Sequence, residues 1–421
     1  MNKRIIFLLS FSLVLFGSFA RDIAQTDSLT TTQTDIKPKE QTANTTKTFL
    51  KVSGYAQAEY QWGEPEANLR VGTANENIQK PFSRIGLRRG FIKAIYGNNI
   101  VSGTFAINVG DRGIIIQEAF FSIKSPWTGA SNIKLGIFDR PFGYEISYSS
   151  SLRESPERAN IIRMLFPEER DLGAMLTLKA DDKSPLSIFK LEAGLFAGNG
   201  IKPETDNHKD FIGHLSAAKK WSKISLLGGI SYYNGGVYQG TKDVYTMQDK
   251  SFVVNSKDEN IGKFAKRQYL GFDAQLIIKN ILGSTLIRGE YIQGVQPSKK
   301  GSTQSPNAST LPSYDTYIRN FNGGYIIVSQ SIGKLPVSVV FKYDWYDPNT
   351  NITINDIGLN NTNESDILRD TFGIGMLWDV NKSIRLQAYF DINRNEKTQN
   401  LAGYNVDKKD NVLTCRIQYK F

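Results

Sequence analysis

Residues 139–172 hold the side chains whose types and spacing could do chemistry in this chain. They include five arginines and five glutamates: Arg140, Arg153, Arg158, Arg163 and Arg170, with Glu145, Glu154, Glu157, Glu168 and Glu169. A guanidinium binds carboxylate or phosphate oxygens through paired N–H donors, so a purely basic set would favour anions. Because glutamates are interleaved with the arginines, we predict instead a mixed-charge eyelet whose transverse field orients polar solutes.

This stretch has neither the period of a strand nor a sustained apolar helical face. Alternating segments lead into it at residues 133–138 and out of it at residues 172–180. We therefore predict a long loop between two strands, folded into the mouth of a barrel. Arg140 is the leading functional candidate, since it stands where the strand before the loop, the fifth along the chain, ends and the loop turns inward. It lies beside Pro141, which cannot donate to a strand ladder.

The elements that must position this loop have a period of two. Leu50, Val52, Ala56, Tyr60 and Trp62 fall on one face of the first segment, and polar residues fall mostly on the other. About sixteen such segments of roughly ten residues follow one another, and this length spans a bilayer as a tilted strand. They lie near residues 50–62, 82–96, 100–110, 113–124, 132–139, 171–180, 187–197, 210–219, 224–233, 267–279, 283–295, 319–332, 336–346, 370–379, 383–393 and 410–421. Around Arg84, Arg88 and Arg89 the alternation breaks, which indicates a bulge or an interface.

Short and long connections alternate along the chain, with the short connection at residues 111–112 as an exception. The long ones are residues 63–81, 140–170, 198–209, 234–266, 296–318, 347–369 and 394–409. Outer-membrane barrels have short periplasmic turns and long outer loops, so the fold class predicted is an all-β transmembrane antiparallel barrel of about 16 strands. A soluble β-sandwich or propeller would also alternate. In a sandwich or propeller, however, the short turns would not all lie on one side and the long loops on the other. Such a fold would also not need the aromatic belt indicated by Trp62, Trp345 and Trp378.

The N-terminus predicts export. Residues 1–20 have the basic start, apolar run and small-residue cleavage site of a signal peptide. Residues 21–48 lack large apolar side chains and predict a disordered periplasmic arm, leaving residues 49–421 as the outer-membrane barrel. The formal charge of +10 becomes +8 once Lys3 and Arg4 are removed with the signal peptide. A positive net charge favours binding of anionic lipids, polyanions or anionic solutes, and it does not distinguish among them. The single cysteine, Cys415, excludes an internal disulfide.

Charged residues on the polar face of the strands are predicted to line the lumen. The basic ones are Arg84, Arg88, Lys134, Lys190, Arg288, Lys342, Arg385 and Arg416, and the acidic ones are Glu59, Glu118, Glu192, Asp273, Glu290, Asp344 and Asp391. Neighbouring strands that carry opposite charges pair them and stiffen the wall. Each of these charges therefore has a structural explanation beside a role in selecting solutes.

The run from residue 133 resembles the phosphate-selective porin O and P family, especially forms from Bacteroidetes-like bacteria. The matching marks are Gly136, Arg140-Pro141-Phe142-Gly143, the serines at 149–151, Glu157-Arg158, the run of residues 169–173 and Gly194 to Gly200. The resemblance covers residues 50–421, with firm motifs only in 133–200. It implies a sixteen-stranded, trimeric outer-membrane channel for small anions, phosphate or polyphosphate among them. The basic ladder of the selective members is diluted here by carboxylates.

Two classes of function are open from the sequence. The first is a passive diffusion channel for small polar or anionic solutes, with outer-membrane lipid around it, in a Gram-negative outer membrane. The second is a surface barrel whose long loops bind a partner, as an adhesin or receptor. A homotrimer is expected from the family resemblance. It is also expected from the Gly- and Ser-rich face of the twelfth segment, which contains Gly323, Ser329 and Ser331. The terminal Phe421 resembles the signal read by the barrel assembly machinery.

Enzymatic and cofactor chemistry find little support in this sequence. The only histidines are His208 and His214, and although Ser216 shares a strand face with His214, no third orienting group is evident. We therefore expect no catalytic residues, no metal and no cofactor. No phosphate-binding glycine loop follows a strand, and nucleic-acid binding is not expected of an exported barrel.

Overall fold

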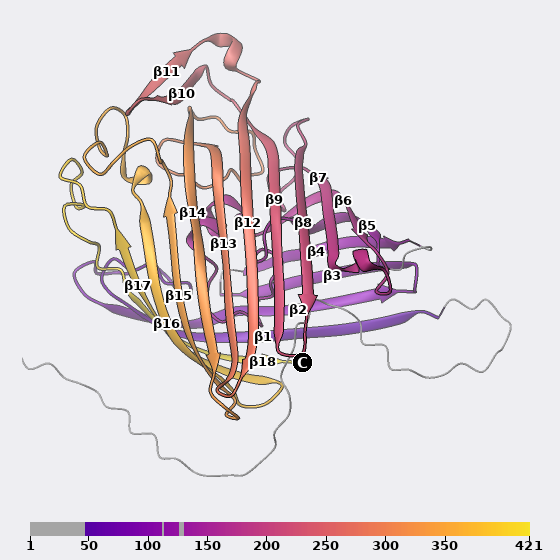
Figure 1. Ribbon diagram of the computed structural model, residues 1–421. Helices are drawn as coiled ribbons and strands as arrows, with labels where there is room; N and C mark the ends of the chain where they lie inside the picture. Colours follow the sequence, from indigo (N-terminus) through magenta and orange to yellow (C-terminus); the bar gives the residue numbers. More distant parts are fainter. Residues whose placement is uncertain (1–46, 112, 126–129) are drawn as a thin grey trace, which may run out of the picture. The chain divides into compact units, whose positions relative to one another are not determined.

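A computed structural model describes residues 47–421, apart from residue 112 and residues 126–129. Those residues form a closed antiparallel β-barrel of sixteen strands (Figure 1). The predicted signal peptide and nearly all of the predicted arm lie outside the described residues, so both remain predictions.

The barrel strands confirm the sixteen predicted segments. They are β1 (Phe49–Gly63), β2 (Phe82–Gly97), β3 (Val101–Gly110), β4 (Gly113–Lys124), β5 (Asn132–Asp139), β6 (Arg170–Lys179), β7 (Phe189–Phe196), β8 (Asp210–Lys220), β9 (Ile224–Tyr238), β12 (Phe264–Asn280), β13 (Gly283–Ser298), β14 (Thr316–Ser331), β15 (Val337–Asp347), β16 (Arg369–Asp379), β17 (Ile384–Asn395) and β18 (Val412–Lys420). Closure is made by β1 and β18, which pair antiparallel from Tyr55 opposite Lys420 to Gly63 opposite Val412.

Two further strands were not predicted. They are β10 (Asp243–Gln248) and β11 (Ser251–Ser256), a hairpin within the long connection between β9 and β12. The hairpin stands at the long-loop end of the barrel (Figure 1), where β10 pairs in parallel with β14. Within the described residues, three short 3-10 helices occur in connections: η1 (Pro185–Ile188), η2 (Asp258–Asn260) and η3 (Glu364–Asp366).

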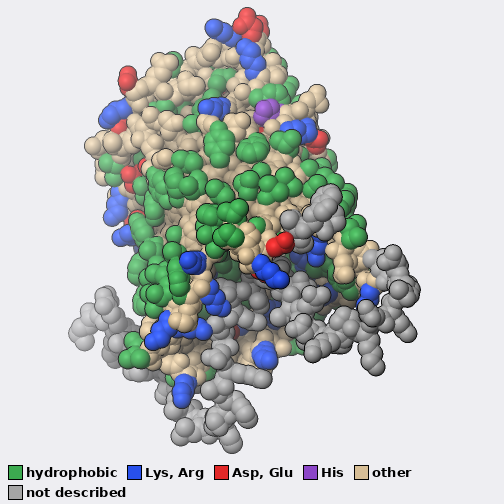
Figure 2. Space-filling view, turned by 45° about the vertical axis from the view of Figure 1, so that its right-hand side comes forward, with side chains coloured by type: hydrophobic (Ala, Val, Ile, Leu, Met, Phe, Trp, Pro, Cys, Tyr) green, Lys and Arg blue, Asp and Glu red, His purple; other side chains and the backbone are tan. Residues whose placement is uncertain are grey.

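The period of two decides which side chains face outward. On β18, Thr414, Arg416 and Gln418 are buried inside the barrel, while Ile417 on the other face is 52% exposed. Figure 2 shows hydrophobic side chains gathered across the middle of one face, with charged side chains above and below. Among the described residues, no helix is long and apolar enough to cross a membrane.

The predicted break in alternation is a bulge between β1 and β2. Gln57 lies opposite Arg89 and the next residue, Ala58, lies opposite Leu87, so Arg88 is an extra residue on β2. A bulge re-aims side chains next to a site. Here it brings the adjacent guanidinium groups of Arg88 and Arg89 to the same carboxylate inside the barrel.

Candidate functional site

The connection between β5 and β6 lies inside the barrel, as the sequence predicted. It contains the short helix α1 (Asn160–Leu165), and Ile161, Ile162 and Leu165 of this helix are no more than 1% exposed. We call residues 140–169 the inner loop. Its backbone and side chains contact strands on opposite sides of the lumen, so it crosses the interior instead of lying along one wall.

One side of the inner loop forms an apolar core with the barrel wall. Phe142 and Phe166 lie 5.0 Å apart between ring centroids, and Tyr269 of β12 packs at 6.4 Å and 5.8 Å from them. Tyr233 of β9 and Phe321 of β14 extend the cluster. Aromatic pairs of this kind contribute about 0.5–1.5 kcal/mol each beyond their buried area. This part of the lumen is therefore filled with side chains.

The other side of the inner loop is hydrogen-bonded to β1, β17 and β18. The amide nitrogen of Gln57 donates to the Ser150 carbonyl at 3.0 Å, and Gln387 donates to the Glu154 carbonyl at 2.7 Å. Gln418 donates to the Ser151 carbonyl at 3.1 Å. A loop backbone at this depth has no strand partner, so these side chains satisfy carbonyls that would otherwise be unpaired.

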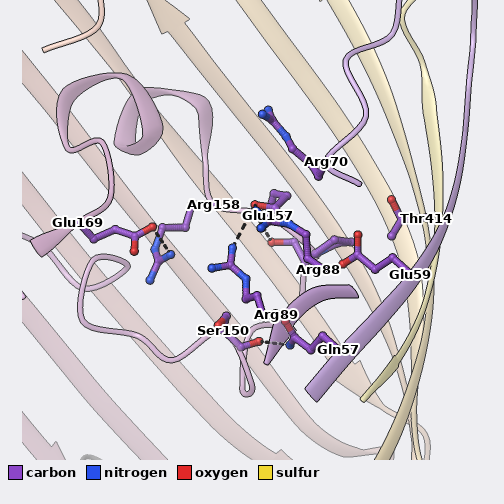
Figure 3. Close-up of polar contacts among 12 residues, drawn as sticks. Gln57, Glu59, Arg70, Arg88, Arg89, Ser150, Glu157, Arg158, Glu169 and Thr414 are labelled. Atoms are coloured by element: carbon purple, nitrogen blue, oxygen red, sulfur yellow. Dashed lines mark hydrogen bonds and ion pairs between the residues drawn. The ribbon is translucent and has the colours of Figure 1, made fainter. Parts of the chain in front are cut away.

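Glu157 is the centre of a charge network between the inner loop and β2 (Figure 3). It accepts from Arg88 at 2.8 and 2.9 Å in a bidentate pair, and Arg89 approaches at 3.5 Å. Arg416 of β18 lies 3.8 Å away and also binds Glu59 of β1. Arginines from separate strands thus hold one loop carboxylate in place.

A second network fixes the end of the inner loop. Arg158 pairs with Glu169 at 2.5 Å and donates to the carbonyls of Glu145 and Ile146. Glu168 and Glu169 both have positive φ, 62° and 64°, a left-handed conformation that costs roughly 1–2 kcal/mol for each L-residue. The ion pairs of Glu169 with Arg158 and Arg170 offset this strain and keep its carboxylate inside the lumen.

Burial and neighbouring charge act in opposite directions on these two carboxyls. Burial alone raises the pKa of Glu157, but Arg88 and Arg89 outweigh it and hold the pKa well below its usual range. Burial likewise raises the pKa of Glu169, and Arg158 and Arg170 lower it to about 2. Both groups therefore stay ionised at neutral pH.

Arg153 differs from the other arginines of the inner loop. Its side chain is 2% exposed, and none of its three guanidinium nitrogens has a hydrogen-bond partner. Burial and the nearby charges of Arg158 and Arg89 lower its pKa to about 9. An unpartnered buried cation is costly. Because all three nitrogens are closed to solvent, Arg153 can act on a passing ion only through its electric field.

The other predicted site residues lie at separate positions and do not form one site. Arg140 is buried at the base of the loop, where it pairs with Asp171 at 3.1 Å and lies over the ring of Phe166. These contacts anchor the loop. Arg170 pairs with Asp139 and Glu169, and Arg163 donates to Asn160. Arg84 binds the β1–β2 connection through Thr73, Ala74 and Glu76, away from the inner loop. Lys134 lies over the rings of Phe120 and Phe138.

Sequence reasoning missed several buried ion pairs because their partners are far apart in the chain. Arg267 of β12 binds Asp210 of β8, and Arg319 of β14 binds Asp366 at 2.8 Å in the β15–β16 connection. Arg89 and Lys93, which pairs with Glu118, were also not selected. The broken alternation at Arg88 and Arg89 was the one signal that could have pointed to Arg89.

Charged side chains of the lumen differ in their exposure to water. Side chains of β2 and the adjoining loop keep measurable exposure, with Arg88 at 19% and Glu157 at 18%. On the opposite wall Arg288 and Lys342 are only 5% and 6% exposed, and each is paired with a carboxylate. The charges along β2 are therefore more accessible to water than Arg288 and Lys342.

Lysines line the short-turn end of the lumen. They lie near the short-turn ends of their strands, on the same face as the inward residues, and five of them are exposed: Lys51 near the start of β1, and Lys124, Lys220, Lys279 and Lys420 at the ends of β4, β8, β12 and β18. Within the described part of the chain, none of the five is paired with a carboxylate. We call this set the lysine rim.

Comparison with known proteins identifies the fold and not a family. No family model matches the chain, and no curated protein matches it. Among solved structures it resembles the outer membrane channel DcaP of Acinetobacter baumannii, with 10% identity and a TM-score of 0.54 over 89% of this chain and 97% of that one. A loop L8 deletion mutant of OmpT, an outer membrane protein of Vibrio cholerae, is similar at 10% identity and TM-score 0.51 over 89% and 99% of the two chains.

OmpF of Salmonella typhi, solved in complex with daunomycin, is similar at 11% identity and TM-score 0.51, over 88% of this chain and 97% of that one. The chain thus has the fold of the outer-membrane channel barrels. The finer resemblance to phosphate-selective porins stays a prediction.

Proposed function

We propose that this protein is an outer-membrane porin of a Gram-negative bacterium, a passive diffusion channel for small polar and anionic solutes. The observation that carries the proposal is the contrast between the two faces of the barrel wall. Outward residues are apolar and exposed, as a lipid-facing surface requires, while inward residues are polar and the inner loop narrows the lumen.

A preference for anions is supported by the lysine rim and by Arg153. The paired charges around Glu157 and Glu169 cancel locally, so they favour neither sign. The five rim lysines have no such partner, and a ring of one sign at a pore mouth concentrates counter-ions. Phosphate and polyphosphate are among the anions that this arrangement would admit.

Planar-bilayer recording tests the proposal. We expect discrete conductance steps from the purified protein, and a reversal potential in a KCl gradient with the sign of anion preference. A folded protein without conductance steps would favour the alternative, a surface barrel that binds a partner through its outer loops. A cation-selective sign would keep the channel and remove the anion preference, phosphate included.

Replacing Arg153 with leucine is expected to reduce anion preference without loss of stability. The substitution removes a buried cation that has no hydrogen-bond partner, so no group is left unpaired. Arg158→Leu is the matched control, since it removes one of the two ion pairs of Glu169, leaves backbone carbonyls unpaired and should destabilise by about 3–5 kcal/mol. Reversal potential and denaturant unfolding measure the two effects. Equal destabilisation by both variants would contradict the assignment of Arg153.

The ion pairs of Glu157 and Glu169 are expected to persist in moderate acid. Glu157 and Glu169 have folded pKa values below their usual 4.5, so their ion pairs contribute fully above pH 4.5. That contribution is lost as the pH falls towards the folded value, about 2 for Glu169. Single-channel conductance should therefore change below about pH 4.5, as these two ion-paired carboxylates become protonated. Conductance that stays constant down to about pH 2 would show that their ion pairs do not hold the loop.

We further propose a homotrimer, assembled into the membrane through recognition of Phe421 by the barrel assembly machinery. An in-vitro-folded form of OmpT from Vibrio cholerae, similar at TM-score 0.50 and 9% identity over 89% of this chain and 99% of that one, is described as a trimer. Native mass spectrometry of the detergent-solubilised protein tests the trimer. Deletion of Phe421 should lower the amount of barrel assembled in the outer membrane.

A further inference from the structure

Four neighbouring short turns form one exposed surface at the end of the barrel opposite the β10–β11 hairpin (Figure 1). They join β8 to β9, β12 to β13, β14 to β15 and β16 to β17. Backbone hydrogen bonds of 2.7 or 2.8 Å link each turn to the next, from Lys279 to Lys223, from Gly333 to Leu282 and from Asp379 to Pro336. We call residues 219–223, 281–282, 334–335 and 380–382 the turn patch.

Lysines are the unpaired charges of the turn patch. Four are exposed and, within the described residues, have no carboxylate partner: Lys219, Lys223, Lys334 and Lys382. They are distinct from the lysine rim, whose side chains lie on the inward face. The acidic residue beside the patch, Asp379, is already paired with Arg385 at 2.6 Å. The patch therefore carries positive charge that no protein group neutralises.

Two other short turns at this end of the barrel have a different composition. Residues 98–100, between β2 and β3, carry no charge, and residues 181–183, between β6 and β7, carry two aspartates beside one lysine. The basic charge is thus a property of the turn patch and not of every short turn.

Large apolar side chains are exposed among the lysines of the patch. Ile281 is 98% exposed, and Leu282 and Leu335 are 64% and 63% exposed. An exposed apolar patch of this kind marks a contact with a membrane or with another protein. A soluble polyanion would leave these side chains in water, whereas a lipid would cover them with the apolar region below its headgroup.

Lys219 and Trp221 place the patch at the level of lipid headgroups. Lys219 follows the exposed Leu215 by four residues along β8, so both lie on the lipid-facing side of the strand. The Lys219 Nζ lies 5.4 Å from the centroid of the exposed Trp221 ring. Tryptophan is enriched at the membrane–water interface, where a lysine stem packs on apolar surface and its ammonium reaches the headgroups.

We propose that the turn patch binds anionic phospholipid of the periplasmic leaflet. Neighbouring lysines hold the phosphate, and the acyl chains pack beside Trp221. Short turns of outer-membrane barrels face the periplasm, so the lipid within reach is that of the inner leaflet. The patch offers ammonium groups and no free carboxylate for the cation of a zwitterionic headgroup, so it selects an anionic one. Basic clusters beside membrane-spanning segments recognise anionic lipids through the same attraction.

Quenching of Trp221 fluorescence by brominated phospholipids tests the proposal. The full-length protein is reconstituted in bilayers of phosphatidylcholine with a minority of phosphatidylglycerol, and each lipid in turn carries bromine on its acyl chains. The difference between the wild-type protein and Trp221→Phe isolates the signal of Trp221. We expect phosphatidylglycerol beside Trp221 to be enriched about fivefold over its share of the bilayer, on the scale of one lysine near an anionic surface.

Two variants with equal net charge separate the patch from the charge of the whole protein. Changing the four patch lysines to glutamine should reduce the enrichment to less than about twofold. The matched control changes four exposed lysines of the outer connections to glutamine and should keep the wild-type enrichment: Lys80, Lys242, Lys257 and Lys263. Equal loss in the two variants, or unchanged enrichment in the patch variant, would contradict the proposal.

The wild-type protein alone can also overturn the proposal. Equal quenching by the two lipids would show that the patch does not select an anionic headgroup. Loss of the enrichment on adding soluble glycerol 3-phosphate, beyond the loss caused by sodium chloride of equal ionic strength, would assign a site for free phosphate instead. Lipid binding requires the folded barrel in a bilayer and not conduction, so this test is independent of the proposed channel function.

Discussion

Removing the inner loop is expected to raise single-channel conductance by roughly three- to tenfold, since a sixteen-stranded barrel without an internal obstruction holds a wide aqueous channel. The change joins Phe142 to Glu168 through a short Gly-Ser linker and keeps Arg140, which pairs with Asp171 at the loop base. It removes Glu157 and Glu154, so Arg88 and Arg288 face water. Planar-bilayer recording at fixed salt measures the result.

The control for this deletion removes the β10–β11 hairpin, residues 243–256, with the same linker. That hairpin contacts the outer end of β14 and adjoining loops, so its loss should leave conductance nearly unchanged. Heat-modifiable gel mobility shows whether each barrel is closed. A closed, loop-deleted barrel with wild-type conductance would falsify the view that the inner loop sets the pore width.

Reversing the charge of the lysine rim is expected to invert the sign of ion selectivity. Changing Lys51, Lys124, Lys220, Lys279 and Lys420 to glutamate replaces a basic ring at the short-turn mouth by an acidic one. Because these side chains are exposed and unpaired in the described part of the chain, their field acts on passing ions and not on a protein partner. The measurement is the reversal potential in a KCl gradient.

A matched variant separates local field from net charge. Lys80, Lys242, Lys257, Lys263 and Lys397 are exposed in the outer connections, and their change to glutamate alters the total charge equally. We expect a smaller shift without a change of sign, because exposed charges beyond about 10 Å are screened at 0.1 M salt. Equal shifts in the two variants would show that the rim has no special position. The rim effect should also weaken as salt is raised.

The barrel could be predicted from the sequence because its causes are local. Alternation of apolar and polar residues depends on neighbours two apart, and turn length depends on a few residues between strands. The inward face followed from the same alternation, so Arg88, Arg288, Lys342, Arg385 and Arg416 were placed in the lumen before their partners were known. The inner loop followed from the missing periodicity of residues 140–170.

The sequence did not predict which charges pair, since pairing depends on barrel closure and on the path of the inner loop. Arg88 and Glu157 are 69 residues apart, and only the bulge on β2 brings Arg88 and Arg89 to one carboxylate. The β10–β11 hairpin was interpreted as loop, because its parallel pairing with β14 joins segments about 70 residues apart.

The sequence by itself therefore determined the strand number, the inward and outward faces and the position of the inner loop, all of which follow from short-range periodicity. Only the tertiary structure decided the state of each arginine in that loop. Arg140 anchors the loop base and Arg158 holds its end, whereas Arg153 is buried without a partner. These three roles look identical in sequence, because a guanidinium acquires its role from the groups that folding places around it.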